Sequence, residues 1–564
     1  MSVAGLPDDQ LLNQALQAQQ AGRSAEAVGL CRRVLANQAG HPHASLLLGL
    51  ILGRDDAAAG APLIERYLER FPDDPMATCN LGTLRQRLGD HAAALALFER
   101  ALVLKPDLAM AWHGSALALH ALGRLDAAAA AFESALTLGA TDALIHNNLG
   151  DLRRSQGRLD DALAAYDAAI AADPWLPVAH TNRGLVLARQ RRPADAVKAF
   201  RQALALEPDS VAAHLGLAEA LEVLHLPGDA RRERVEAYHH QPVILEPASG
   251  GPTVLLLCSA DRRDVSVRFL LDPARVTKIH LMLLRPQDGG PHPPAVLDGL
   301  PPFDLVFNTI ADADLGVPYF DEVAAIIARA GRPVLNAPER LHATRRDRLA
   351  DTLAGIPGLL VPETRRLSRA VLAGTRIERP QLVRPAGDHG GEALMLVEDD
   401  GALERFRLSA PAEHFYLSDF CDFRSADGLY RKYRLIFIDR EPYPYHLVIG
   451  AHWKLHYWRN EKDVTDAMKA EEAAFLEDWQ SVFKGALGDT ARAIGRRLDL
   501  DYGGMDCGIL PDGRIVLFEA NANMLVHLND SAERFPHKHR FVPRIFEAMT
   551  DFVQRQLTPP PPSC

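Results

Sequence analysis

The chain of 564 residues is too long for one hydrophobic core, because domains typically contain about 100–200 residues, so its length predicts several folding units. Its 62 Lys and Arg against 73 Asp and Glu give a formal net charge of −11, which argues against a general nucleic-acid binder. A hydrophobic share of 48% with 24% charged residues is typical of globular proteins and excludes disorder throughout the chain.

No membrane partner is expected, since the apolar run Leu46–Gly53 is far shorter than the roughly 20 residues that span a bilayer. The N-terminal segment carries Asp8 and Asp9 and lacks the basic-then-apolar pattern of a signal peptide. The six cysteines lie far apart without metal-ligand spacing, which favours single thiols in a reducing cytoplasm: Cys31, Cys79, Cys258, Cys421, Cys507 and Cys564.

The first half of the chain repeats itself every 34 residues. The recurring aromatic and small residues are Phe98, Phe132, Tyr166 and Phe200, followed by Ala101, Ala135, Ala169 and Ala203. Prolines at 72, 106, 174 and 208 fall on the same period and end each unit, because proline cannot continue a helix. Such a period is typical of stacked helix pairs.

This pattern resembles the tetratricopeptide repeat family over about residues 8–240, and the resemblance implies an all-α solenoid in the predicted domain 1–240. Clear repeats begin near Pro75, Ala109, Ala143 and Pro177, weaker ones near Asp8 and His41, and a capping repeat near Val211. The family's groove implies a peptide or protein partner; the alternative is a groove that only dimerises the chain or docks it on a scaffold. Candidate groove residues on the first helices are Asn80, His113, Asn147, Asn148, Asn182 and Arg183.

Residues 241–252 are rich in proline and glycine and are predicted to form a linker. Short apolar runs follow, as in strands that are buried on both faces, with a helical pattern at Asp321–Ala330. The runs are Thr253–Cys258, Ile279–Leu284, Phe303–Asn308 and Pro333–Asn336. Strands that alternate with helices predict an α/β layer over residues 253–340.

The last part of the chain contains neither a GxxxxGK[ST] loop nor a GxGxxG motif after a strand, so the common phosphate cradles are missing from the sequence. It instead contains a strand-like segment at Gln381–Pro385, a glycine-rich stretch, and two strands joined by the turn Pro511–Gly513. This order of signals resembles the ATP-grasp superfamily over about residues 253–555. The resemblance implies a pre-ATP-grasp layer at 253–340 and an α+β ATP-grasp domain at 341–555, before a disordered tail at 556–564.

The resemblance assigns Mg²⁺ (or Mn²⁺) to Asp506, Glu519 and Asn521. The residues support this independently, because side chains two apart on a strand share a face and the Asp512-Gly513 turn pairs the two strands. Three oxygen-bearing side chains should thereby meet, and Mg²⁺ prefers such ligands. The alternative is that Asp506 caps a strand end while Glu519 is an exposed edge residue.

The nucleotide phosphates are expected to meet Arg348 and Arg384, which stand where the family commonly has lysines. The chain contains nine lysines and 53 arginines, so this departure follows a general bias, and arginine keeps the charge. Gly387, Gly390 and Gly391 form the candidate phosphate loop, since glycines let backbone N–H groups approach phosphate; an ordinary glycine-rich hairpin is the alternative.

Substrate contacts are expected from two further strands. The segment Phe415–Phe420, with Asp419, fits the hinge that meets adenine in the family. Arg434 matches the family's arginine at the reacting groups, with Lys432 on the same face, and a structural salt bridge is the alternative. The remaining candidates are His446, His452, Lys454 and His456, which would contact substrate or form a polar strand face, with His527, His537 and His539 later in the chain.

The resemblance implies an ATP-dependent ligase that phosphorylates a carboxylate and then joins it to an amine, acting on a peptide or protein that the repeats recruit. A small-molecule amine or amino acid is a possible further substrate, and the oligomeric state is left open. The first alternative is a repeat-based scaffold whose ATP-grasp domain binds nucleotide but has lost catalysis. The second is phosphotransfer to a small acceptor.

Overall fold

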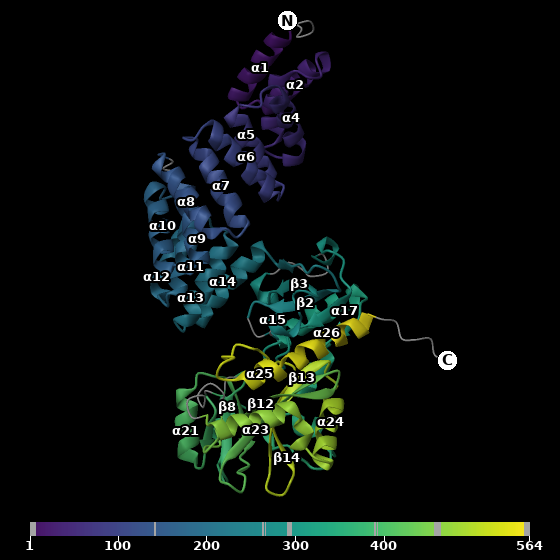
Figure 1. The fold of residues 1–564 in the computed structure, drawn as a ribbon. Coiled ribbons are helices and arrows are strands. Elements are labelled where there is room, and N and C mark those ends of the chain that lie inside the picture. The colour runs from purple at the N-terminus through teal and green to yellow at the C-terminus, as the bar shows by residue number, and fades with distance from the viewer. Residues whose placement is uncertain are drawn as a thin grey trace, which may run out of the picture. The chain divides into compact units, whose positions relative to one another are not determined.

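The computed structural model describes residues 7–139, 143–261, 264–265, 267–289, 296–388, 391, 393–455 and 464–557. The chain divides into two compact units, Met1–Arg234 and Val235–Cys564 (Figure 1). No helix of the described residues combines the length and the apolar character that crossing a bilayer requires.

The first unit is built from helices that follow one another as antiparallel pairs (Figure 1). The pairs are α1 (Asp8–Gln20) with α2 (Ser24–Asn37), α3 (Pro42–Leu52) with α4 (Ala57–Arg70), α5 (Pro75–Arg87) with α6 (His91–Leu104), α7 (Ala109–Ala121) with α8 (Leu125–Thr137), α9 (Ala143–Ser155) with α10 (Leu159–Ala172), α11 (Pro177–Arg189) with α12 (Pro193–Leu206), and α13 (Val211–Val223) with α14 (Pro227–His240). The predicted all-α solenoid is confirmed, and the helix starts match the predicted repeat starts.

The period of 34 residues has a packing cause. Phe98 of α6 is fully buried, and glycines of two successive first helices, Gly82 of α5 and Gly114 of α7, lie against its ring, where a side chain would collide with it. Tyr166 and Phe200 fill the same place in later repeats, against Gly150 and Gly184. One aromatic ring per repeat therefore requires a small residue on each adjoining helix, which fixes the spacing of both.

The second unit begins with a mixed sheet in the order β1-β3-β2-β4-β5. The parallel strands are β2 (Thr253–Ser259), β3 (Thr277–Leu283), β4 (Leu305–Asn308) and β5 (Val334–Leu335), accompanied by α15 (Val267–Leu270) and α17 (Val317–Ala330). The predicted linker at 241–252 is partly structured, because β1 (Val243–Glu246) pairs antiparallel with β3. The segment is short and lies among prolines, so its sequence resembles a linker although it forms a strand at the edge of the sheet.

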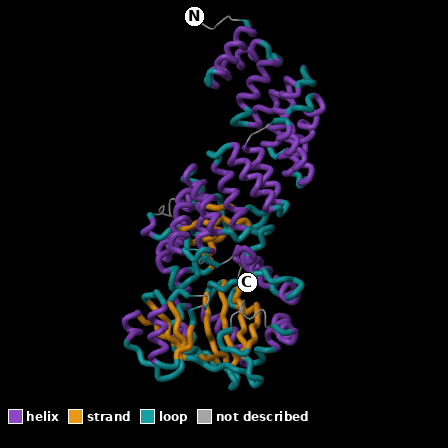
Figure 2. Tube along the Cα trace, turned by 90° about the vertical axis from the view of Figure 1, so that its left-hand side faces the viewer, coloured by secondary structure: helices purple, strands orange, loops and turns teal. Residues whose placement is uncertain are grey.

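Two further sheets complete the second unit, and Figure 2 shows their strands as separate groups. All strand pairs in them are antiparallel except β14 with β6, which is parallel. The four-stranded sheet has the order β7 (Thr364–Ser368), β10 (His414–Asp419), β8 (Gln381–Pro385) and β9 (Met395–Val397). The five-stranded sheet has the order β12 (Glu441–Gly450), β11 (Tyr430–Ile438), β13 (Tyr502–Ile509), β14 (Ile515–Asn521) and β6 (Leu359–Leu360). Short helices α18 (Pro338–Leu341) and α19 (Leu349–Thr352) lead from the parallel sheet to β6.

Each of these two sheets has one apolar face covered by helices. Phe415 and Leu417 of β10 pack with α20 (Arg369–Ala373) and α21 (Asp400–Ser409). Tyr433 of β11 meets Phe475 of α23 (Asp466–Glu477) at a ring-centroid distance of 5.2 Å, beside α24 (Ala486–Leu498). Because side chains alternate along a strand, the opposite faces of both sheets carry polar residues.

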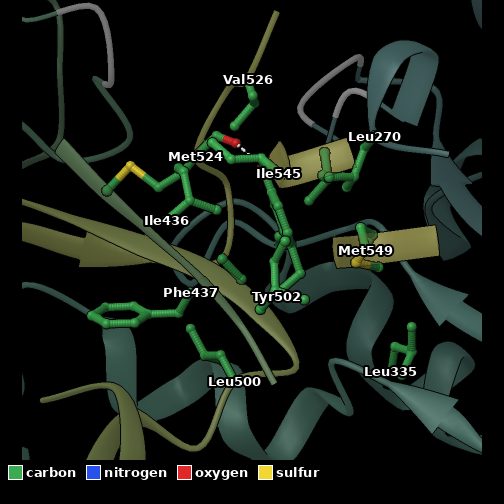
Figure 3. Close-up of a cluster of buried hydrophobic side chains, with 14 of the residues drawn as sticks. Leu270, Leu335, Ile436, Phe437, Leu500, Tyr502, Met524, Val526, Ile545 and Met549 are labelled. Carbon is green, nitrogen blue, oxygen red and sulfur yellow. Dashed lines mark hydrogen bonds between the residues drawn. The ribbon is translucent and has the colours of Figure 1, made fainter. Parts of the chain in front are cut away.

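The parallel sheet and the five-stranded sheet share one hydrophobic core. Figure 3 shows Leu335 of β5 and Tyr502 of β13 in the same cluster as Ile545 and Met549 of α26 (Pro543–Leu557). Asn336 has a positive φ of 55°. Its side-chain amide connects the two sheets, because Oδ1 accepts from the Tyr502 backbone N–H and Nδ2 donates to the Tyr502 backbone oxygen at 2.8 Å. The predicted tail at 556–564 begins inside α26, and residues 558–564 lie outside the described part of the chain.

Candidate anion-binding site

A row of polar residues crosses the five-stranded sheet. The strand register places His446 of β12 opposite Arg434 of β11, Arg434 opposite Asp506 of β13, and Asp506 opposite Glu519 of β14. Residues that are paired across neighbouring strands point to the same face. Four residues from four strands therefore line one polar face.

Two irregularities in pairing shape this row. The register between β13 and β14 shifts after Asp506, so that Cys507 faces Leu517 while Asp506 faces Glu519, and Phe518 is the extra residue. The β11–β12 register shifts beside Arg434, with Tyr445 as the extra residue. A bulge turns the next side chain to the other face of its strand, so the bulge at Phe518 brings Glu519 onto the polar face.

The carboxylate of Asp506 is held by two basic groups. Arg434 donates from Nε to Oδ1 at 2.6 Å and from Nη2 to Oδ2 at 2.8 Å, and Lys432 Nζ lies 3.2 Å from Oδ2. Burial alone would raise the pKa of Asp506, but Arg434 and Lys432 outweigh it and hold that pKa below its ordinary value. Asp506 is therefore a buried carboxylate that stays ionised.

Glu519 is paired in the same way. Arg346, from the loop before α19, contacts Glu519 Oε1 with Nη2 at 2.5 Å, and Asn521 donates from Nδ2 to the same oxygen at 2.6 Å. Burial lowers the pKa of Arg346, but Glu519 more than offsets this, and the pKa is raised overall. Asp506, Glu519 and Asn521 thus lie together on one sheet face.

The four-stranded sheet contributes a second polar row. Its register places Tyr416 of β10 between Arg366 of β7 and Arg384 of β8. The Tyr416 hydroxyl donates to both oxygens of Asp314, at 2.7 and 2.8 Å. Arg384 is nearly fully buried, and its Nη2 donates to the Asp388 backbone oxygen.

Arg384 in the second row interacts electrostatically with Glu519 in the first row and with Arg346. Burial, and next the charge of Arg346, lower the pKa of the Arg384 guanidinium to about 10, while Glu519 and Asp388 act in the opposite direction. Arg384 Nε is buried without a hydrogen-bond partner among the described residues. We call Arg346, Arg384, Lys432 and Arg434, together with Asp506 and Glu519, the basic cluster. Four cations against two carboxylates leave it short of negative charge, even with Asp388 at its edge, so it suits an anion.

The oxygen donors of the basic cluster fit a divalent cation in kind. Two carboxylates and an amide converge on one face, and Mg²⁺ commonly takes one or two carboxylates and completes its shell with water and phosphate oxygens. No group of three His, Cys, Asp or Glu side chains suited to a metal ion occurs in the described residues. Two carboxylates and an amide leave coordination positions that water or phosphate oxygens would complete.

Several residues predicted from the sequence lie outside the basic cluster. Arg348 is exposed at the start of α19, and Arg346, two positions earlier, points into the cluster instead. Asp419 ends β10 and pairs with Arg379, with Nη2 at 2.7 Å from Oδ2. Arg348 departs from the prediction because it lies in a loop, where no regular element fixes which side chains share a face. Asp419 lies at the end of a regular strand, and its ion pair with Arg379 accounts for its position.

The predicted phosphate loop is described only in part. Gly387 follows β8 with a positive φ of 80°, and Gly391 has a positive φ of 65°, so both adopt the backbone conformation that favours glycine. Gly390 lies outside the described residues. The glycine loop therefore stays a prediction.

The histidine-rich segment after β12 is not a strand. β12 ends at Gly450, so His452 and Lys454 follow it in a bend and do not share a strand face as predicted; His456 lies outside the described residues. Lys454 Nζ reaches back to the Leu394 carbonyl oxygen at 2.6 Å. Lys454 thereby connects the region after β12 to the segment before β9 in the four-stranded sheet.

A buried ionic network adjoins the polar row. Glu472 of α23 lies 2.8 Å from His537 Nε2 and 3.5 Å from Lys538 Nζ, both of α25 (Pro536–Phe541), and Lys538 also approaches Asp530 at 3.7 Å.

Burial, and then the charge of Arg434, lower the pKa of His446 well below its ordinary value. His446 is therefore neutral at physiological pH.

The first helices of the repeats form a second candidate surface. Asn182 of α11 donates to Asn147 Oδ1 of α9 at 3.1 Å, and Asn148 of α9 lies 3.2 Å from His113 of α7. The sequence predicts that these residues line the groove, but Asn147 and Asn182 are buried where successive first helices meet. Arg183 pairs with Asp167 at 2.6 Å. The amides thus tie neighbouring repeats together along one face.

Family models match this part of the chain. A model described as tetratricopeptide repeat matches residues 12–75, 79–143 and 181–238, and one described as TPR repeat matches residues 150–190. Residues 12–238 carry tetratricopeptide repeats. Such repeats imply a protein-interaction scaffold, with peptides or proteins as partners.

Three solved structures are similar to this chain at low identity. YrrB, described as a TPR protein with an unusual peptide-binding site, is 20% identical with a TM-score of 0.28. The match covers 32% of this chain and 94% of the YrrB chain. A tetratricopeptide protein from Parabacteroides merdae ATCC 43184 is 14% identical, with a TM-score of 0.36 and coverages of 42% and 93%. Pseudomonas aeruginosa PilF is 23% identical, with a TM-score of 0.28 and coverages of 29% and 76%. No curated protein matches the chain.

Proposed function

We propose that the tetratricopeptide repeats recruit a peptide or protein, and that the second unit binds ATP at the basic cluster and joins a carboxylate to an amine in the manner of the ATP-grasp superfamily. The observation that carries the proposal is the buried excess of positive charge at Arg346, Arg384, Lys432 and Arg434. A triphosphate supplies the missing negative charge in one ligand.

The strand arrangement supports the same assignment. The four-stranded sheet presents Arg384 and the five-stranded sheet presents Asp506 and Glu519, and Arg384 interacts electrostatically with Glu519. A nucleotide between two polar sheet faces agrees with the resemblance that the motifs suggest. Arg346 replaces Arg348 in the proposed phosphate-binding set.

Asp506, Glu519 and Asn521 would hold Mg²⁺ (or Mn²⁺), which, when bound, neutralises charge on the phosphates of the nucleotide. The arginines then supply the remaining phosphate contacts, because a guanidinium binds two oxygens at once. Arg434 and Lys432 lie side by side at Asp506, so they are placed to orient the phosphoryl group that is transferred.

The proposed reaction has two steps. An oxygen of the substrate carboxylate forms a bond to the γ-phosphorus while the bond between that phosphorus and the β,γ-bridging oxygen breaks, which releases ADP. The acceptor amine then bonds to the acyl carbon, and phosphate leaves with the electron pair of the C–O bond while the amine loses a proton to water. Positioning and charge stabilisation by the basic cluster meet the main demands of both steps.

Nucleotide binding is tested on the full chain by a thermal shift with ATP and Mg²⁺, and catalysis by ADP release in a screen of amino acids and peptides. Glu519→Gln should lose the shift and the ADP release. Asp512→Asn, in the exposed β13–β14 turn, is the matched control and should keep both. A shift that survives in Glu519→Gln and Arg384→Met alike would contradict the site.

A second candidate function is a scaffold that binds nucleotide without catalysis. The observation in its favour is that both carboxylates are already paired with arginine, Asp506 with Arg434 and Glu519 with Arg346. Nucleotide binding without ADP release on any acceptor, together with no acyl hydroxamate after addition of hydroxylamine, would favour the scaffold over the ligase.

A further inference from the structure

A tight turn that follows the parallel strand β4 reaches the four-stranded sheet. Asp312 closes this turn, because its Oδ1 accepts from the backbone N–H of Asp314 at 2.8 Å and from that of Leu315 at 3.0 Å. Asp312 is itself buried, and α17 begins directly after the turn. The turn is therefore a fixed feature of the parallel sheet, and it presents Asp314 and Leu315 to the four-stranded sheet.

The two residues of the turn contact the two neighbours of Arg384. Across the sheet, Tyr416 lies opposite Arg384, and its hydroxyl donates to both carboxylate oxygens of Asp314. Along the strand of Arg384, Gly387 follows the end of β8, and a β-carbon on it would come within 3.0 Å of the Leu315 side chain. The turn thus holds the surroundings of Arg384 from two directions.

The hydrogen bonds between Tyr416 and Asp314 join two buried groups. Tyr416 is 1% exposed and the Asp314 side chain is 9% exposed. Burial, and then the hydrogen bond to Asp314, raise the pKa of Tyr416, so its hydroxyl keeps its proton and stays a donor. Arg366 Nε lies 3.7 Å from Asp314, beyond hydrogen-bond distance, so the short contacts of this pair come from Tyr416.

The contacts of Arg384 itself do little to fix its orientation. Its Nε is buried without a hydrogen-bond partner in the described part of the chain, and its Nη2 donates to the backbone oxygen of Asp388, beside Gly387. A guanidinium binds phosphate through two N–H groups at once, which requires a defined orientation. The neighbours that the turn holds must therefore supply that orientation.

We propose that Asp314 is a positioning residue of the anion site, which through Tyr416 holds Arg384 in the orientation that binds phosphate. This rests on the proposed function and adds a residue of the parallel sheet to it. The charge of Asp314 has the same sign as that of phosphate, so its contribution to binding comes through the hydrogen bonds and not through attraction.

Isothermal titration calorimetry on the full chain tests the proposal with two probes, MgATP and inorganic tripolyphosphate. Tyr416→Phe removes the hydroxyl, keeps the ring, and should weaken the binding of both probes about tenfold. Tyr319→Phe is the matched control, since Tyr319 is also 1% exposed and donates to Asp261 at 2.7 Å, but both residues belong to elements around the parallel sheet. The control should leave both affinities within about twofold. Equal effects of the two substitutions would overturn the proposal.

Variants of Asp314 separate positioning from charge. Asp314→Asn keeps an acceptor for the Tyr416 hydroxyl and should retain both affinities within about threefold. Asp314→Leu has a similar shape without an acceptor and should lose about tenfold. If Asp314 acted only as a charge, both variants would bind phosphate more tightly, which would refute the positioning role. Circular dichroism of the ligand-free variants confirms that each titrated protein is folded.

The two probes keep this proposal apart from the nucleotide proposal. If the unaltered protein binds tripolyphosphate but not ATP, the nucleotide proposal fails and the variants still decide the role of Asp314. If it binds neither probe, the anion site is wrong and this proposal falls with it. If it binds ATP and Tyr416→Phe leaves that affinity unchanged, the positioning role alone fails.

Discussion

The Arg384 side chain lies in surroundings that oppose its charge. It is buried, it is close to Arg346, and its pKa falls to about 10. A buried charge with incomplete compensation destabilises a fold, and replacing it with an apolar residue of similar length is often neutral or stabilising. A residue retained at such a cost fits a role in binding an anion.

Arg384→Met should therefore raise the melting temperature of the ligand-free protein by about 2–4 °C and at the same time remove the shift caused by ATP. Arg348→Met, on an exposed arginine outside the basic cluster, should alter neither value. Differential scanning fluorimetry with and without ATP measures both effects. A variant that is destabilised without ligand, yet still responds to ATP, would contradict the anion role of Arg384.

Gly114 illustrates how one residue fixes the stacking of repeats. A β-carbon there would collide with the Phe98 ring, whereas at Gly29 in α2 there is open space. Gly114→Ala should destabilise the first unit by about 1–3 kcal/mol through overpacking. Gly29→Ala should stabilise it by about 0.5–1 kcal/mol, because alanine favours a helix. Urea unfolding followed by circular dichroism measures both, and equal effects of the two substitutions would refute the packing explanation.

Elements with a strong period could be predicted from the sequence. The helix pairs follow from residues such as Phe98 and Phe132, and the strands β2, β3 and β4 follow from continuous apolar runs. The meeting of Asp506 and Glu519 was predictable because a tight turn joins their strands. The bulge at Phe518, which completes that meeting, leaves no mark in the spacing.

Elements whose sequence shows no periodic pattern of apolar residues were harder to predict. Arg346 and Arg348 lie in a loop where only the packed structure decides which side chain points inward. β1 is short and set among prolines, so it resembles a linker. Tyr416 and Arg366 face Arg384 only through the registers of β7, β10 and β8, which depend on pairing between distant segments.

The carboxylates of Asp506 on β13 and Glu519 on β14 each form an ion pair with an arginine, which leads to a prediction about metal binding. In the ligand-free protein Arg346 occupies an oxygen of Glu519, so a divalent ion without nucleotide meets neutralised carboxylates. Arg346→Gln should bind Mn²⁺ at least tenfold more tightly than the unaltered protein when no nucleotide is present. Electron paramagnetic resonance of free Mn²⁺ measures this directly. Arg345→Gln is the control, since Arg345 pairs with Asp347; a similar gain in that variant would show a general charge effect.

At the scale of the whole molecule, the chain combines two units that each have their own core. Under the proposed function, the link between a recruiting unit and a catalytic one would turn the meeting of acceptor and active site into an intramolecular event. The gain appears as a lower acceptor concentration for half-maximal rate, while the chemical step is unchanged.

A peptide acceptor that the repeats bind and that carries a free amine should therefore show a KM about 10–100-fold lower than a peptide with the same amine that they do not bind, at a similar kcat. Met110→Ser combined with Leu144→Ser, which changes two exposed side chains on the first helices α7 and α9, should raise the KM of the bound peptide towards that of the unbound one and leave ATP binding unchanged. Steady-state ADP release at saturating ATP measures both constants. If kcat falls with the double variant while KM stays constant, the repeats influence the chemistry itself and do not act by concentrating the acceptor.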